Sequence, residues 1–171
     1  QASIVEAMTL ADLVANADTI ALGHVLSTES RWTADGMAIV TELRFEVERE
    51  VEGCATGDIL TLVTLGGVVG ELGQRVDGEA ELQIGEQALL FLEAQDDHFR
   101  VVGLGQGAWL VEVDEGGIAW ARPQLSGLSF AAVERTGLEG KARVLSLSSA
   151  PALADEPLDH LLQRLDALCG E

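Results

Sequence analysis

The chain has 171 residues, of which 47% are apolar, and its 29 acidic and 10 basic residues give a formal net charge of −19. This length and apolar content predict a single folded domain, 1–171, and exclude an intrinsically disordered chain. The charge argues against nucleic acid and anionic membrane surfaces as partners, because binding phosphate requires a positive patch. The apolar runs are also too short for a membrane span of about 20 residues.

The first predicted element is a short helix at 9–17. Apolar residues recur there at helical spacing, and Thr9 with Asp12 three residues later forms the pattern of a capping box. The stretch before it, 2–8, is apolar and could add as a strand to the edge of a neighbouring sheet. The candidate assembly residues in this stretch are Ala2, Ile4, Val5 and Met8.

The next two predicted elements are strands at 19–28 and 39–51. From Ile39 to Val51, apolar and charged residues alternate with a period of two, which places one face toward the core and the other toward water. At about 3.3 Å per residue this second strand would be roughly 40 Å long. So long a strand in a small domain must coil or bend, as strands do in small barrels.

Further strands complete a β core at about 18–122. The segment 68–84 is polar and rich in glycine, which indicates a hairpin or long loop around Asp77-Gly78. The strand at 88–93 is apolar on both faces and is therefore expected to lie at the centre of the sheet. The remaining predicted strands are 58–65, 99–102, 109–113 and 118–120.

Glycines alternate in the stretch "VVGLGQGAW", 101–109, behind an apolar run. This is the opening of a dinucleotide-binding loop, but that motif requires a helix to follow, so that the helix N-terminus meets the pyrophosphate. Residues 109–113 instead have the pattern of a strand. The glycines are therefore predicted to mark a bulge or tight crossing in a β ribbon, with Gln106 as a structural polar group.

The segment 123–153 shows no clear pattern, although Phe130–Arg135 could form one helical turn or more. A C-terminal amphipathic helix is predicted at 157–169, opened by Pro157 and carrying a stripe of leucines. The predicted fold is therefore mainly β: a small, OB-like barrel or curved sandwich on which an N-terminal and a C-terminal helix pack.

Three histidines, His24, His98 and His160, fall on separate elements without a second ligand at metal-binding spacing. His24 is expected to be a core histidine on the apolar face of its strand. No metal site, cofactor site or catalytic constellation is predicted. Carboxylates gathered across strands could still serve a hydrolase, because their spacing lies in space rather than in sequence.

Three tryptophans and two cysteines are the other candidate functional residues. The tryptophans could form a surface patch for a sugar or a protein partner, or could pack in the core or at its rim; they are Trp32, Trp109 and Trp120. Cys54 and Cys169 could form one disulfide that pins the C-terminal helix to the main body. The alternative is two unrelated free thiols.

The order of short motifs over 10–113 resembles a group of secreted bacterial proteins of unknown function. It is also similar to the netrin/tissue-inhibitor type of OB-fold barrel. Inhibitors of that type use an N-terminal cysteine against a catalytic zinc, and Gln1-Ala2-Ser3 does not carry that feature. The resembling motifs are Ala17-Asp18, Ser30-Arg31-Trp32, Val51-Glu52-Gly53, Gly66-Gly67, Gly85-Glu86, Leu89–Leu92, Val102-Gly103 and Gln106-Gly107.

These features lead to two hypotheses about function. The first is a non-enzymatic extracellular binding or self-assembling module, forming a homo-oligomer or filament through the N-terminal stretch or sheet edges, or binding a protein partner. The second is a secreted hydrolase. The acidic composition, the even cysteine count and the absence of a start methionine predict a secreted, periplasmic or cell-surface location.

Overall fold

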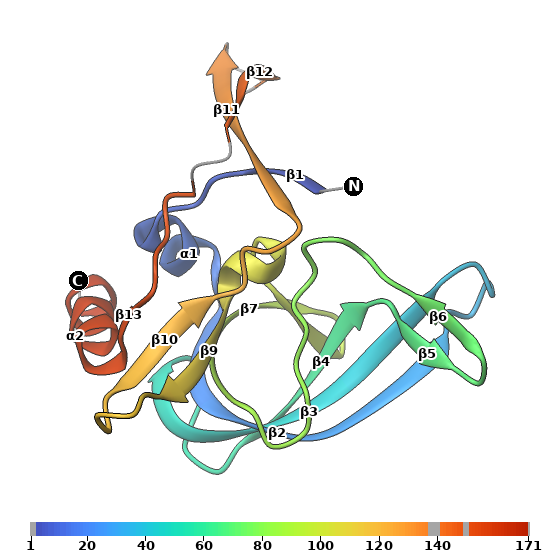
Figure 1. Cartoon of the computed structure of the whole chain (residues 1–171), viewed down its shortest axis with the longest axis horizontal. Helices are drawn as coiled ribbons and strands as arrows, with labels where there is room; N and C mark the ends of the chain where they lie inside the picture. Colours follow the sequence, from blue (N-terminus) through green and yellow to red (C-terminus); the bar gives the residue numbers. More distant parts are fainter. Residues whose placement is uncertain (1–2, 137–140, 149–150, 171) are drawn as a thin grey trace.

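The computed structural model describes residues 3–136, 141–148 and 151–170, and their fold is mainly β, as predicted (Figure 1). Two α-helices lie near the two ends of this part of the chain: α1, Leu10–Asn16, and α2, Leu158–Cys169. The strands are β1 Ser3–Glu6, β2 Thr19–Trp32, β3 Ile39–Glu52, β4 Ile59–Leu65, β5 Gly67–Val69, β6 Leu72–Gln74, β7 Gln87–Gln95, β8 His98–Val101, β9 Ala108–Val113, β10 Ala119–Pro123, β11 Leu128–Thr136, β12 Lys141–Ser148 and β13 Glu156–Pro157.

Five strands close into a ring in the order β7-β2-β3-β4-β8, with β8 pairing back to β7. The neighbours are antiparallel except β4 and β8, which run parallel and meet at Leu62 and Phe99. On the other side of β7, the sheet continues through β9, β10 and β13. A closed ring of five strands is the architecture of a small, OB-like barrel, so the predicted fold class is confirmed.

The two long strands, β2 and β3, bend as their length requires. Their pairing shifts register after Ile20, after Leu22 and after Val25, and such bulges bend a strand and increase its twist. Gly23 lies inside this bent region, where a Cβ atom would stand 2.0 Å from the backbone oxygen of Glu46. The strands can therefore cross this closely only because residue 23 has no side chain.

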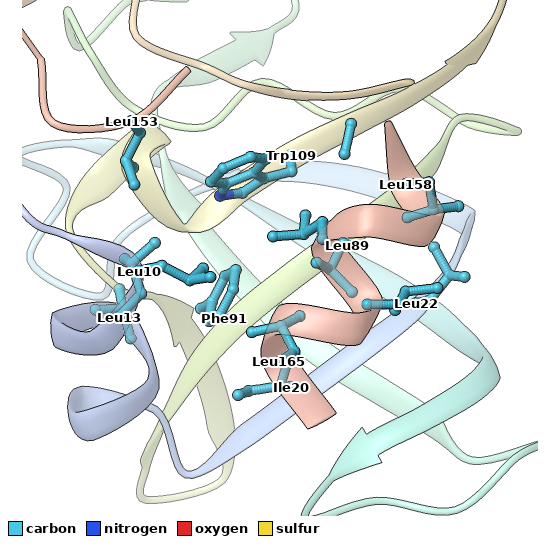
Figure 2. Close-up of a cluster of buried hydrophobic side chains, with 14 residues drawn as sticks. Leu10, Leu13, Ile20, Leu22, Leu89, Phe91, Trp109, Leu153, Leu158 and Leu165 are labelled. Atoms are coloured by element: carbon cyan, nitrogen blue, oxygen red, sulfur yellow. The ribbon is translucent and has the colours of Figure 1, made fainter. Parts of the chain in front are cut away.

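The barrel wall separates two apolar clusters. The inner cluster fills the barrel, and its largest buried side chain is Phe45. The outer cluster lies between the wall and the two helices, and it includes residues of β2, β7 and β9 together with α1 and α2 (Figure 2). Strand β7 supplies Leu90 to the inner cluster and Leu89 and Phe91 to the outer one, which confirms its central place and explains why it is apolar on both faces.

Both helices form where the sequence predicts them. The Thr9 hydroxyl accepts a hydrogen bond from the Asp12 amide at 3.2 Å, and the Asp12 carboxylate accepts one from the Thr9 amide at 2.9 Å. This is the expected capping box. The leucine stripe of α2 packs into the outer cluster through Leu158, Leu161, Leu162 and Leu165.

A second sheet, in the order β1-β11-β12, shares no strand with the barrel sheet. Strand β11 contains the segment Phe130–Arg135, so the helical turn considered there is wrong. The physical reason is that its backbone groups pair with the next strand, β12, and that Phe130 and Ala131 also pair with β1 on the other side. Figure 1 shows β11 and β12 standing away from the barrel.

The glycine-rich segment 68–84 divides into a hairpin and a loop. Strands β5 and β6 form the hairpin, with Val69 paired to Leu72, so the turn precedes Asp77-Gly78. Residues 75–86 then lead back to β7. No helix in the described part of the chain is both long and apolar enough to cross a membrane.

Candidate functional site

The alternating glycines lie at a close crossing of backbones. Gly103 has a φ of +67°, a 3-10 turn follows at Leu104–Gly107, and β9 begins at Ala108. A Cβ atom on Gly105 would stand 2.0 Å from the Gln124 backbone oxygen, and one on Gly107 would stand 2.3 Å from that of Val102. The expected crossing in a β ribbon is therefore confirmed, and a strand follows the glycines.

We expect Gly105→Ala to lower the free energy of unfolding by about 1–3 kcal/mol or more, because overpacking against a fixed backbone forces the strands apart. Gly116→Ala is the matched control, since its Cβ would have as its nearest neighbour the Asp114 side chain at 3.4 Å. Urea unfolding followed by circular dichroism measures both. Equal stability of the two variants would contradict a close crossing at Gly105.

Gln106 is buried at this crossing and fastens the N-terminal stretch to the barrel. Its Nε2 donates hydrogen bonds to the backbone oxygens of Glu6 at 3.2 Å and Gly103 at 3.3 Å, and its Oε1 accepts one from the Met8 amide at 2.9 Å. One side-chain amide thus binds the backbone at the last residue of β1 and just beyond it. The expectation of a structural polar group is confirmed.

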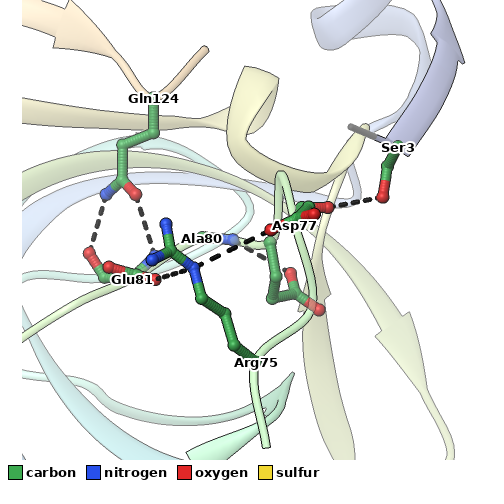
Figure 3. Close-up of polar contacts among 7 residues, drawn as sticks. Ser3, Arg75, Asp77, Ala80, Glu81 and Gln124 are labelled. Atoms are coloured by element: carbon green, nitrogen blue, oxygen red, sulfur yellow. Dashed lines mark hydrogen bonds and ion pairs between the residues drawn. The ribbon is translucent and has the colours of Figure 1, made fainter. Parts of the chain in front are cut away.

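The N-terminal stretch forms a strand, and this strand pairs within its own chain. Strand β1 lies parallel to β11, with Ser3 opposite Leu128 and Glu6 opposite Ala131. Ser3 also donates from its amide to the Gly127 oxygen at 2.9 Å and from its hydroxyl to the Asp77 oxygen at 2.5 Å (Figure 3). We call this set of contacts the β1 seat: the β11 edge, Gln106, and the loop oxygens of Gly127 and Asp77.

The predicted assembly residues occupy different environments in this seat. Ile4 is 61% exposed on β1, whereas Val5 is partly buried opposite Phe130. Met8 packs against the outer cluster. Ala2 lies outside the described residues.

The three tryptophans do not form one surface patch. Trp109 is 1% exposed, so its place in a surface patch is wrong: β9 turns it into the outer cluster beneath the helices (Figure 2). Trp32 is 41% exposed near the end of β2. Trp120 is partly exposed on β10 and donates from its ring nitrogen to Asp114 at 2.9 Å. This bond and those from the Ile118 and Gly116 amides lower the pKa of Asp114, the Ile118 bond most.

The disulfide considered between Cys54 and Cys169 is not formed, because both cysteines are free thiols. Cys54 packs against the inner cluster and Cys169 against the outer one, so they contact different cores. Burial raises the pKa of Cys54, and burial together with nearby Glu52 raises the pKa of Cys169 to about 11. Both sulfurs are therefore held as protonated, weakly nucleophilic thiols.

His24 is not a core histidine, because α2 covers Ile20 and Leu22 on its strand but leaves His24 partly exposed. Its Nδ1 lies 2.6 Å from Oε1 of Glu48, whose other oxygen accepts from Gln87 at 2.9 Å. Among the residues that the structure describes, no group of three or more His, Cys, Asp or Glu side chains could hold a metal ion.

The most deeply buried carboxylate in the described chain, Glu79, has a structural environment. Its oxygens accept hydrogen bonds from the backbone amides of Leu65 at 3.0 Å and Ala80 at 3.1 Å, and the Arg100 guanidinium lies 3.4 Å away. Its side chain is 4% exposed, against 69% for Glu81 two residues later. No local sequence signal separates these two acidic residues.

Comparisons with known proteins place no relative beside this chain. No protein-family model, no curated protein and no solved structure matches it. The resemblance to netrin/tissue-inhibitor barrels and to secreted bacterial proteins therefore stays a prediction. Function must be argued from the chain's own residues.

Proposed function

We propose that this protein is a non-enzymatic extracellular module that assembles with further copies of itself by exchanging β1. In this arrangement β1 of one copy occupies the β1 seat of the next. The observation that carries the proposal is the β1 seat itself: a four-residue strand pairs with β11 in a sheet that shares no strand with the barrel. Strand exchange adds a strand to an edge by main-chain hydrogen bonds.

Exchange of β1 costs little, because the same contacts form whether β1 comes from the same chain or from another. The strand is short, its Ile4 side chain is mostly exposed, and it is held by backbone pairing with β11 and by the bonds of Ser3 to backbone oxygens. Segments with few buried apolar contacts open at a small fraction of the global unfolding free energy. Two copies with open β1 strands could then pair reciprocally or head to tail.

The charge of the chain sets the conditions under which assembly occurs. Copies with a formal charge of −19 repel one another, and that repulsion is screened over about 8 Å at physiological salt and about 3 Å at 1 M. Assembly is therefore favoured by salt. The extracellular placement rests on the acidic composition, since the cysteines are unpaired.

The test is a double-cysteine variant, Ile4→Cys/Ser129→Cys, in a Cys54→Ser/Cys169→Ser background. These two positions are Cα partners across β1 and β11, and neighbouring strands lie about 4.8 Å apart, within the range of a disulfide. We expect mild oxidation at 1 M salt to yield covalent multimers on a non-reducing gel, because the two thiols of each seat belong to different chains.

The matched control is Glu112→Cys/Trp120→Cys in the same background, which joins Cα partners of β9 and β10. These strands belong to the barrel sheet and cannot exchange as β1 does, so this pair should oxidise within one chain. If the β1–β11 pair likewise yields only single-chain products at 1 M salt, exchange of β1 is wrong.

A further inference from the structure

A cavity of about 590 Å³ opens at one mouth of the barrel. Its walls are the ends of β2, β3 and β4, the β5–β6 hairpin and the loop 75–83. Its size falls within the range of small-molecule sites in proteins. The cavity shares no lining residue with β1, β11 or Gln106, so an inference about it does not rest on strand exchange.

Three hydroxyl side chains form a row across the cavity wall. Ser30 is the register partner of Thr41, which is in turn the partner of Thr64. The Ser30 and Thr41 hydroxyls lie 2.9 Å apart, and Thr41 donates to the Gly66 oxygen at 2.8 Å. A Cβ atom on Gly67 would stand 2.4 Å from the Ser30 hydroxyl oxygen, so a glycine is what allows the β5 backbone to cross this row.

Thr64 differs from the other two, because its hydroxyl has no partner among the described residues. The residue is 6% exposed and lines the cavity. The hydroxyl oxygen itself is accessible from the cavity, so it is not an unsatisfied buried group but one that is open to a ligand. A ligand hydroxyl in the cavity would supply the missing bond.

The other polar groups of the cavity are uncharged or carry balanced charge. Gln74 uses its Oε1 to accept from the Ile39 amide at 2.6 Å, and its NH₂ group stays available to donate. Arg75 lies 3.7 Å from Glu81 (Figure 3), and Arg100 compensates Glu79. Nothing in this lining favours an anion, and the net charge of −19 repels one.

Trp32 does not line the cavity, but it lies next to its wall on β2. It follows Ser30 by two residues on β2, so both side chains leave the same face of the strand. Its register partner is Ile39, the residue whose amide binds the cavity side chain of Gln74. An exposed indole beside a row of hydroxyl groups offers an apolar face to the C–H side of a polyhydroxylated ring.

We propose that this cavity binds a neutral saccharide. The hydroxyl row and the Gln74 amide pair with sugar hydroxyls, and Trp32 contacts the ring face. The site is a binding site without a reaction, since the one buried carboxylate in its wall is engaged in structural hydrogen bonds.

The experiment probes an array of neutral, sialylated and sulfated glycans with the full chain, followed by titration calorimetry with the glycan that binds. We expect a neutral glycan to bind. Thr64→Val should weaken its binding about tenfold or more, because the variant removes the hydrogen bond but keeps the side-chain shape. Trp32→Ala should also weaken it, whereas Trp120→Ala, at a tryptophan on β10 and not on the strands of the hydroxyl row, should leave it unchanged.

Thermal unfolding separates a lost contact from a damaged fold. Thr64→Val replaces a hydroxyl that makes no hydrogen bond within the described chain by a methyl group, so its melting temperature should stay close to that of the unaltered chain. The proposal is overturned if no glycan binds, if only anionic glycans bind, or if Thr64→Val and Trp32→Ala both bind with unchanged affinity.

Discussion

Replacing Trp109 by alanine is expected to lower the free energy of unfolding by about 3–5 kcal/mol, the usual cost of deleting a large aromatic side chain from a core. Trp109 is 1% exposed and belongs to the outer cluster that joins β2, β7 and the two helices. Its ring nitrogen also donates to the Gln106 backbone oxygen at 3.0 Å. The variant therefore loses packing and leaves a buried acceptor at the β1 seat unsatisfied.

Trp120→Ala is the control for this substitution. The residue type is the same, and Trp120 lies on the neighbouring strand, but its side chain is partly exposed and binds the exposed Asp114. Its loss should cost less than about 1 kcal/mol, as for substitutions outside a core. Guanidinium unfolding of both variants measures the difference. Similar costs would show that the outer cluster does not depend on Trp109.

The second large effect is expected at Glu79. Glu79→Ala removes the acceptor of two backbone hydrogen bonds and leaves the guanidinium of Arg100 without its partner. Breaking a buried ion pair from one side costs about 3–5 kcal/mol, and the partial exposure of Arg100 places the expected loss near the lower limit. The loop 75–86 should lose its attachment to the end of β4.

Glu81→Ala is the matched control, because the same residue type lies two positions away with a side chain that is 69% exposed. Its effect should stay within about 0.5 kcal/mol. The coupling between Glu79 and Arg100 is measured with the single variants Glu79→Ala and Arg100→Ala and the double variant Glu79→Ala/Arg100→Ala. The losses of unfolding free energy in the two single variants should sum to more than the loss in the double variant. Additive losses, or an equal loss in Glu81→Ala, would rule out the buried pair as the anchor of this loop.

Part of the fold follows from local sequence patterns. The period-two alternation over 39–51 reports a strand with one face in the barrel core, and the leucine stripe at 158–168 reports a helix with one buried face. The strand at 88–93 is apolar on both sides because it has a core on each face. In each case the environment repeats along the element, so the sequence carries a period.

The pairing of β1 with β11 has no such local signal. The partners lie more than 120 residues apart, and four residues are too few for a period to show. The segment 130–135 shows no alternation of its own either. One of its partners, β12, follows it directly in the chain, whereas the other, β1, comes from the distant N-terminal stretch.

Single side chains were the least predictable feature. Glu79 and Glu81 are equivalent in sequence, and the fold buries one against Arg100 while leaving the other in water. Cys54 and Cys169 make an even count, yet they pack against different cores. The sequence by itself determined the class of fold and the two helices, because these depend on patterns among neighbouring residues, and its alternating glycines marked the crossing without identifying Gln124 as the partner of Gly105. The tertiary structure alone decided the β1 seat, the cavity and the burial of single charged groups, because these depend on which distant backbones meet.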